Sequence, residues 1–190
     1  RHLLRSHVRS IALYSYLENK SMYERLGFRT VGGFLRVAIS RRTPKRITKR
    51  RHVPFSEILK LDRHAFGADR SRLLRRLLNE FPRNWAWIVK GSAVSGYALV
   101  KEYKDSSEIG PSVCEQMNQD AVRRLLEYAV ALARKWPLEM SIPKSHQIVL
   151  ETAIRMGFGV ERKGIMMDLA NPDGMKVSPD IVAFGFLDKG

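Results

Sequence analysis

The sequence has one cysteine, five scattered histidines and no long hydrophobic run. Because Cys114 has no second cysteine to pair with, an intrachain disulfide framework is excluded, and the composition fits a reducing, cytoplasmic environment. No apolar run reaches the roughly 18 residues of a membrane-spanning helix, so no membrane partner is expected. The histidines show no metal-ligand spacing, and we expect no metal.

The first residues also lack the features of a chain start. Arg1-His2-Leu3-Leu4 contains neither an initiator methionine nor the apolar core of a signal peptide. We therefore expect the 190 residues to belong to a longer chain. Their length fits one to two domains, and a hydrophobic fraction of 44% is enough for a globular core.

The net charge of +15 is concentrated in the first quarter of the sequence. Residues 1–52 carry 14 lysines and arginines against two glutamates, whereas residues 53–190 carry 20 against 17 acidic residues. The excess peaks between residues 41 and 51. Such a run is typical of a solvated linker, or of a segment that attracts nucleic acid, acidic membranes or cofactor phosphates. No aromatic residues alternate with these charges, which weakens the case for single-stranded nucleic acid.

Two segments 130 residues apart resemble each other. Met22-Tyr23-Glu24-Arg25-Leu26-Gly27-Phe28 and Thr152-Ala153-Ile154-Arg155-Met156-Gly157-Phe158 both end in a long aliphatic residue, glycine and phenylalanine. Each follows one apolar stretch and precedes another. Glycine tolerates the left-handed conformation that ends many helices. The pattern therefore predicts two copies of a strand–helix–Gly–Phe–strand unit.

Hydrophobic periodicity and turn residues predict the remaining elements. Strands are expected at 10–17, 29–39, 46–52, 85–90, 93–102, 108–114, 138–142, 160–169 and 181–187, and helices at 19–26, 56–66, 70–80, 121–135 and 146–156. From residue 46 onward the order is β-α-α-β-β-β-α-β-α-β-β. Cys114 is expected to be buried on its strand.

That order resembles the GNAT acyltransferase fold, an α/β (α+β) fold with a mixed, mostly antiparallel sheet flanked by helices. Tyr23–Phe28, following Leu13-Tyr14-Ser15, is similar to a family signature, and Phe66–Leu74 and Ile109-Gly110-Pro111 resemble the second domain of bacterial tandem GNAT enzymes. The resemblance implies the C-terminal part of a first GNAT domain at 1–42, a basic linker and first strand at 43–52, and a second GNAT-type domain at 53–190.

The resemblance also implies a reaction, in which acetyl-CoA gives its acyl group to a primary amine of a small molecule or peptide. Tyr23 is similar in position to the family's general acid, because a phenol holds a proton at neutral pH that it can give to the departing thiolate. The alternative is a packed ring with a wet hydroxyl. Asn19 would contact the pantetheine arm or cap a helix. Arg1 would follow the cofactor's pyrophosphate loop.

The second copy departs from the family at its cofactor site. Gln119 stands where the resemblance implies a glycine, and Asp120 puts a carboxylate at the helix N-terminus, where it would cap the helix and repel a pyrophosphate. Ala153 replaces the tyrosine. This copy is therefore expected to lack acetyl-CoA chemistry and to contribute substrate-binding residues instead, namely Asp69, Arg70, Trp87 and Tyr97. The structural alternatives are a helix N-cap for Asp69 and core positions for the tryptophans.

Two other functions remain open at this point. One is a non-catalytic ligand-binding or dimerisation module of GNAT type, which leaves a homodimer open. The other is nucleic-acid binding through the basic segment. We rank nucleic-acid binding third, because the basic excess lies in a predicted linker without a recognisable reading element.

Overall fold

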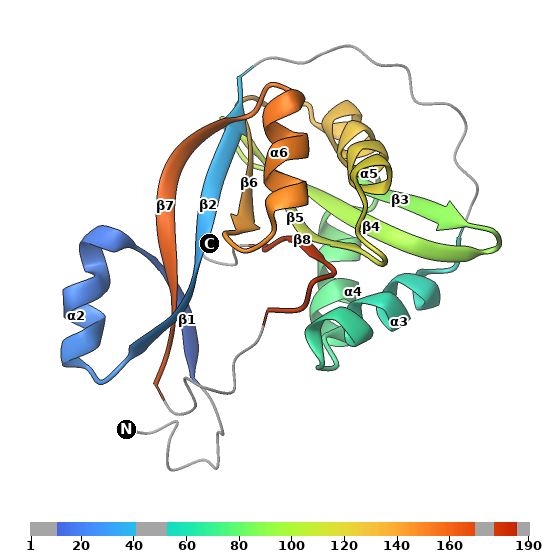
Figure 1. Ribbon diagram of the computed structural model, residues 1–190. Helices are drawn as coiled ribbons and strands as arrows, with labels where there is room; N and C mark the ends of the chain where they lie inside the picture. The colour runs from blue at the N-terminus through green and yellow to red at the C-terminus, as the bar shows by residue number, and fades with distance from the viewer. Residues whose placement is uncertain (1–10, 41–52, 170–176, 186–190) are drawn as a thin grey trace.

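The computed structural model describes residues 11–40, 53–169 and 177–185 (Figure 1). Arg1, the basic run at 41–51 and the strand predicted at 46–52 lie outside the described residues. The strands are β1 (Ala12–Tyr16), β2 (Arg29–Ile39), β3 (Trp85–Lys90), β4 (Ala93–Glu102), β5 (Ser107–Cys114), β6 (Leu138–Pro143), β7 (Gly159–Asp168) and β8 (Ile181–Ala183). The helices are the 3-10 turn η1 (Leu17–Asn19), α2 (Lys20–Arg25), α3 (Phe55–Phe66), α4 (Ser71–Glu80), α5 (Gln119–Leu132) and α6 (Gln147–Arg155).

All eight strands join one sheet in the order β1-β7-β2-β6-β5-β4-β3, with β8 paired to β5 off this path. Among the described strands, only β5 and β6 run parallel to each other. This confirms the predicted mixed, mostly antiparallel sheet. Residues of β2 alternate between two cores: Leu35 and Val37 pack with α5 and α6, whereas Phe34 packs with α3 and α4. The two helix pairs therefore cover opposite faces of the sheet (Figure 1).

The two predicted repeats are the units β1-α2-β2 and β6-α6-β7, and they interleave. β7 lies between the two strands of the first unit, and β2 lies between the two strands of the second. The strands of one unit therefore pair with those of the other unit and never with each other. Strands of 1–42 and of 53–190 thus share one sheet. The assignment of these two segments to separate domains stays a prediction.

The register of β2 on β7 reveals an approximate twofold axis. Arg29 pairs with Asp168 and Ala38 with Gly159, and a shift of 130 residues converts either pair into the other. The two register irregularities, at Thr30/Gly32 and Arg36/Val37, exchange in the same way. Phe34 pairs with Gly164, and this pair maps onto itself. The axis therefore passes between Phe34 and Gly164, and the sequence repeat is a structural symmetry.

Both repeat helices end in the same hydrogen bonds. The Phe28 N–H donates to the Tyr23 carbonyl over 3.1 Å, and the Phe158 N–H donates to the Ala153 carbonyl over 3.0 Å. The intervening glycines, Gly27 and Gly157, have φ values of 91° and 95°. Glycine adopts this left-handed conformation without the steric penalty of a side chain. The prediction that glycine ends each helix is confirmed.

Gly164→Ala is expected to destabilise the protein by about 1–3 kcal/mol, the usual cost of overpacking a core. A Cβ at this position would overlap the ring of Phe34, which is 1% exposed. Gly159→Ala on the same strand is the control, because its Cβ would meet no atom within 4 Å. Urea unfolding compares the two. Equal midpoints for both variants would contradict close packing at the axis.

Candidate functional site

The parallel strands β5 and β6 diverge, and β8 fills the space between them. They pair only from Ser107–Ile109 to Leu138–Met140. Beyond this point β8 bonds to both: the Cys114 N–H donates to the Asp180 carbonyl over 2.8 Å, and the Phe184 N–H donates to the Ser141 carbonyl over 2.9 Å. Val182 and Ala183 are fully buried. The groove between the two strands is thus occupied by the chain itself.

The contacts around β8 are close. A Cβ at Gly110 would overlap the Phe184 carbonyl, and one at Gly185 would come within 2.8 Å of the Pro111 nitrogen. Nδ1 of His146 lies 2.7 Å from the Ile181 carbonyl and donates to it in the neutral Nδ1–H tautomer. Burial lowers the pKa of His146, although the Ile181 carbonyl and Asp180 oppose this shift. His146 therefore holds β8 as a neutral donor.

The N-terminus of α5, where the resemblance implies a cofactor site, is capped by a side chain. The Asn118 side chain accepts the Ala121 N–H over 3.0 Å. The cap is therefore Asn118, and the expectation that Asp120 caps this helix was wrong. Asp120 lies outside the N-cap position and pairs with Arg123 at 3.2 Å. Gln116 has a φ of 51° and accepts a hydrogen bond from Lys90 over 2.6 Å.

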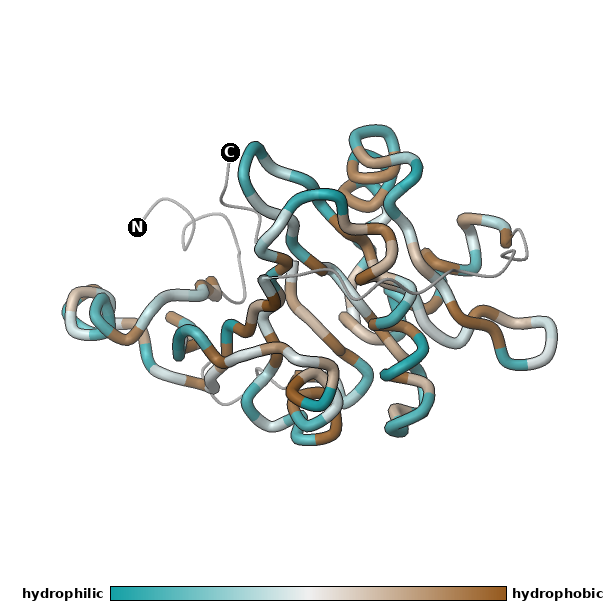
Figure 2. Tube along the Cα trace, turned by 90° about the horizontal axis from the view of Figure 1, so that it is seen from above, coloured by the Kyte–Doolittle hydropathy of each residue, from teal (hydrophilic) through white to brown (hydrophobic). Residues whose placement is uncertain are grey.

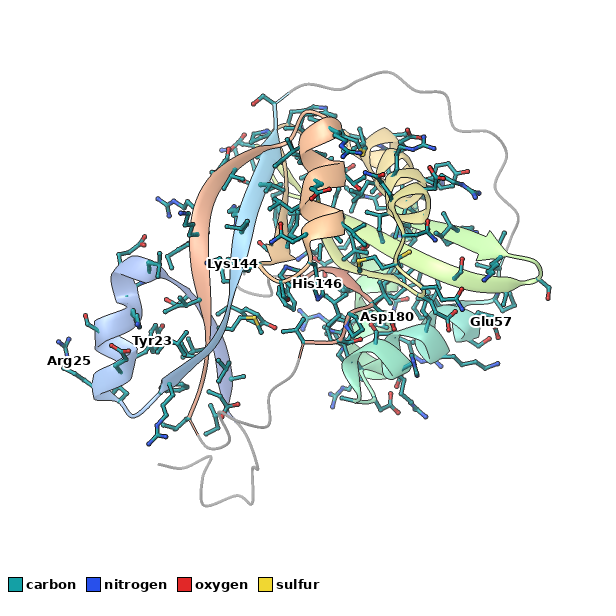
Figure 3. The ribbon with its side chains drawn as sticks, viewed as in Figure 1. Tyr23, Arg25, Glu57, Lys144, His146 and Asp180 are labelled. Carbon is teal, nitrogen blue, oxygen red and sulfur yellow. The ribbon has the colours of Figure 1, made fainter. Side chains whose placement is uncertain are left out.

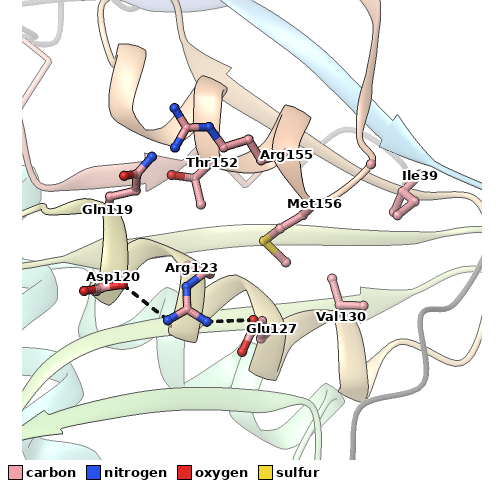
Figure 4. Close-up of a pocket in the computed structure, with 10 residues that line it drawn as sticks. Ile39, Gln119, Asp120, Arg123, Glu127, Val130, Thr152, Arg155 and Met156 are labelled. Carbon is pink, nitrogen blue, oxygen red and sulfur yellow. Dashed lines mark hydrogen bonds and ion pairs between the residues drawn. The ribbon is translucent and has the colours of Figure 1, made fainter.

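A pocket of about 650 Å³ lies between α5 and α6 (Figure 4). Ile39, Val130 and Met156 form its apolar wall. Of its two arginines, Arg123 pairs with Asp120 and with Glu127 at 3.1 Å, so acidic residues of the pocket compensate its charge. Sequence reasoning missed this pocket, because its walls come from separate segments whose contact no local pattern reveals.

Tyr23 lies on α2, across the β2–β7 pair from Lys144 and His146 (Figure 3). Its side chain is half-buried, and its ring meets Phe28 edge-on with 5.8 Å between centroids. The equivalent residue in the second unit, Ala153, is fully buried. The hydroxyl of Tyr23 therefore has no counterpart in the second unit.

Asn19 immediately precedes α2, as His146 precedes α6, so the two residues occupy equivalent positions. Asn19 makes no side-chain cap, and the alternative that it caps the helix was wrong. The chain enters α2 through η1, so Asn19 already has helical dihedrals (φ −92°, ψ −1°), whereas a capping side chain needs an extended backbone. The second unit uses this position to hold β8, through His146.

The structure brings two of the predicted substrate residues together at Asp62, a residue that sequence reasoning missed. The Tyr97 hydroxyl donates to the Asp62 carboxylate. Arg70 donates to it through two nitrogens, Nε at 3.0 Å and one terminal nitrogen. Burial, followed by the charge of Asp62, raises the pKa of Tyr97 well above its usual value. Tyr97 is fully buried, so its hydroxyl faces this carboxylate and not an open cleft.

The other two predicted substrate residues have different surroundings. Asp69 is exposed, and the Ser71 N–H, which donates to it over 2.9 Å, lowers the pKa of its carboxyl. Trp87 is half-buried, faces Tyr97 across the β3–β4 pair and packs against the core under α3 and α4. Trp85 is 3% exposed, as its core alternative predicted. Substrate contact by Asp69, Arg70, Trp87 and Tyr97 stays a prediction.

Cys114 is fully buried on β5, which confirms its predicted place. Burial raises the pKa of its thiol to about 11. Within the described ranges, no three His, Cys, Asp or Glu side chains gather in a way that could hold a metal ion. None of the helices described is long and apolar enough to cross a membrane.

Comparisons with known proteins identify the fold. The chain superposes on a proposed acetyltransferase from Pyrococcus horikoshii with a TM-score of 0.71 and 22% identity, covering 97% of this chain and 63% of that one. A GCN5-related N-acetyltransferase from Sphaerobacter thermophilus gives a TM-score of 0.58 at 16% identity, covering 90% and 61%. At these identities the superpositions establish the fold alone.

Sequence comparison gives the family. YitH of Bacillus subtilis, an uncharacterized N-acetyltransferase, is 24% identical over 155 residues, which cover 78% of this chain and 54% of YitH. The chain thus spans about half the length of this relative. The family model described as "Acetyltransferase (GNAT) domain" matches residues 58–178, more than half of the chain. The chain belongs to the GNAT acetyltransferase family.

Proposed function

We propose that the chain is the C-terminal part of a tandem GNAT enzyme that moves an acetyl group from acetyl-CoA to a primary amine of a small molecule or peptide. GNAT membership implies acyl transfer from an acyl-CoA. The proposal adds that chemistry belongs to the first unit and that the second unit is its catalytically inactive counterpart. The observation that carries this proposal is β8, which occupies the groove of the second unit.

Three features of the second GNAT copy, residues 53–190, favour its inactivity. The backbone groups of β5 and β6 that an extended cofactor arm would use are bonded to β8. The Asn118 side chain accepts a backbone N–H at the N-terminus of α5, so this N–H is no longer available to donate to a pyrophosphate. Ala153 has no proton to donate. An acyl-CoA would have to displace β8 and the cap before it could bind here.

The first unit supplies the groups that the second unit lacks. The amine attacks the thioester carbonyl, and the tetrahedral intermediate collapses by breaking the carbon–sulfur bond. The departing thiolate takes the phenol proton of Tyr23, and the new ammonium loses its proton to a base outside the described residues. Asn19 would hold the pantetheine arm from the position at which His146 holds β8. Arg1 remains a proposed cofactor contact.

Calorimetric titration of the gene-encoded protein with acetyl-CoA tests whether only one of the two copies binds the co-substrate. We expect one acetyl-CoA per chain, and release of CoA thiol when primary amines are added. Two bound molecules per chain would contradict the proposal that β8 blocks the second binding site. Absence of binding, or binding without turnover on amines and peptide N-termini, would contradict acetyl transfer and favour a sensing module.

A further inference from the structure

We infer that Arg162, on β7, is a positioning residue for Tyr23, the proposed proton donor of the first unit. Together with Arg36 it holds Tyr16 and Glu18 at the entrance to α2. These contacts set where the Tyr23 hydroxyl lies. Arg162 acts through the chain and not on the substrate. The inference rests on the proposed function, and it gives β7 of the second unit a part in the reaction of the first.

Tyr16 is the last residue of β1, where the chain leaves the sheet. It pairs with Gly164 at the end of the β1–β7 register. Its half-buried ring packs against Phe34, with 6.4 Å between the ring centroids. Beyond Tyr16, η1 and α2 bury none of their residues, and Figure 2 shows the α2 segment projecting from the body of the molecule. The start of α2 therefore depends on how Tyr16 is held.

Two arginines of other strands hold Tyr16, one at its hydroxyl and one at its ring. Nη1 of Arg36, on β2, donates to the Tyr16 hydroxyl over 3.3 Å. The guanidinium carbon of Arg162 lies 4.8 Å from the centroid of the Tyr16 ring, within the range of a cation–π contact. The same guanidinium pairs with Glu18, in η1, at 3.9 Å. Arg162 therefore bridges the end of β1 and the turn that leads into α2.

The two arginines are direct partners in the β2–β7 register. Like charges opposite each other in a sheet are destabilising, so the pair of Arg36 and Arg162 needs compensation. Glu139, on β6, supplies it for Arg36 through an ion pair in which both side chains are largely buried. Glu18 supplies it for Arg162. The arrangement thus ties the entrance of α2 to two strands of the second unit, β6 and β7.

The twofold counterpart of this arginine pair carries no charge. A shift of 130 residues converts Arg36 and Arg162 into Met166 and Gly32, which are also partners in the β2–β7 register. The helix of the second unit, α6, is held by packing against α5 instead. Departures from local stability rules are expected at functional sites. A costly pair that its counterpart avoids therefore indicates a role in the first unit, to which acetyl transfer is assigned.

The contacts of Arg162 are weak one by one, because its side chain is 60% exposed and water screens an exposed ion pair. Their loss should leave the fold intact while loosening the start of α2. Catalysis is more sensitive than stability to such a change, since a displacement of about 1 Å can lower a rate about 100-fold. Arg36 is less suited to a test, because its removal would break the buried ion pair with Glu139.

A double-mutant cycle of Arg162→Met with Tyr23→Phe tests the inference in the gene-encoded protein. We expect Arg162→Met to lower kcat for acetyl transfer about tenfold in the wild-type background. In the Tyr23→Phe background its effect should be less than about twofold, because the donor that it positions is then absent. A merely structural role would lower kcat by the same factor in both backgrounds.

Arg134→Met is the matched control. Arg134 pairs with Glu102 at the same distance of 3.9 Å, and its side chain is 69% exposed, but it lies after α5 and away from α2. Its replacement should leave kcat unchanged. The melting temperatures of Arg134→Met and Arg162→Met should both stay within about 4 °C of the wild type, as expected for the loss of one exposed ion pair.

Hydrogen exchange provides a readout that does not depend on activity. The amides of Leu26, Gly27 and Phe28 donate to carbonyls of α2, so their exchange reports on local opening of this helix. Arg162→Met should speed their exchange at least about threefold. The equivalent amides at residues 156–158, which donate to carbonyls of α6, should exchange at the wild-type rate and provide the internal control.

Unchanged exchange at the end of α2 in Arg162→Met would overturn the inference, whatever the activity. An equal fall of kcat in the wild-type and Tyr23→Phe backgrounds would overturn it as well. Faster exchange in a protein that transfers no acetyl group would keep Arg162 as the residue that holds α2 and would remove the proposed function instead.

Discussion

Tyr23→Phe is expected to lower kcat for acetyl transfer by about 100-fold or more, with little change in KM for acetyl-CoA. General acid catalysis contributes roughly 10²–10⁴-fold, and the substitution removes only the hydroxyl that donates the proton. The ring stays in place against Phe28, and the backbone carbonyl of residue 23 still accepts the Phe28 N–H. Thiol release by the gene-encoded protein, over a range of acetyl-CoA concentrations, separates kcat from KM.

Tyr128→Phe is the control for this measurement. Tyr128 is half-buried on α5, outside the first unit, so the same chemical change is made away from the proposed site. Its kcat should stay within about twofold of the wild type. A loss below threefold in Tyr23→Phe, or the same loss in both variants, would remove Tyr23 as proton donor and leave it as a packing residue.

Local patterns predicted most element boundaries to within two residues. The strands expected at 29–39, 85–90 and 93–102 have these bounds in the structure. Apolar runs bounded by glycine carry this information along the chain, as at the Gly91-Ser92 turn. The repeat was visible for the same reason, because Gly27 and Gly157 end helices through the same hydrogen bonds.

The pairing of these elements could not be predicted locally. The final strand was expected over 181–187 and is described over 181–183. Nothing in its sequence indicates that it lies between β5 and β6, because the space it fills depends on strands about 40 to 70 residues away. The interleaving of the repeats also depends on pairing between strands that are distant in the sequence. Local spacing predicted both units without showing that each supplies a partner for the other.

Asp62 is a buried partner of two predicted site residues that the sequence analysis missed. It lies on the apolar stripe of α3 with Ile58, Leu61 and Ala65, and all four are buried. A charged residue in such a stripe indicates a buried polar partner. That signal was present, but the partners Arg70 and Tyr97 come from other elements. Sequence reasoning therefore assigned them to a substrate cleft.

Asp62→Ala is expected to destabilise the protein by about 3–5 kcal/mol, because it removes one partner of a buried ion pair and leaves the other uncompensated. Asp62 is 1% exposed and accepts hydrogen bonds from Arg70 and from the buried Tyr97 hydroxyl. Asp69→Ala is the control. Its carboxylate is exposed and bonds to the Ser71 N–H, so its loss should cost about 1 kcal/mol or less. Denaturant unfolding measures both.

The double variant Asp62→Leu with Arg70→Met decides what Arg70 does. Replacing both members of a buried ion pair by apolar residues is often neutral, because no charge is left unpaired. The double variant should therefore recover part of the stability that Asp62→Ala loses, because the buried Tyr97 hydroxyl still lacks its acceptor. With the fold restored, activity reports on Arg70 itself: a wild-type kcat and KM would make it a structural residue. A raised KM for the amine in a stable double variant would instead place its guanidinium on the substrate, as the sequence first suggested. Stability no better than that of Asp62→Ala would mean that the pair contributes more than charge compensation.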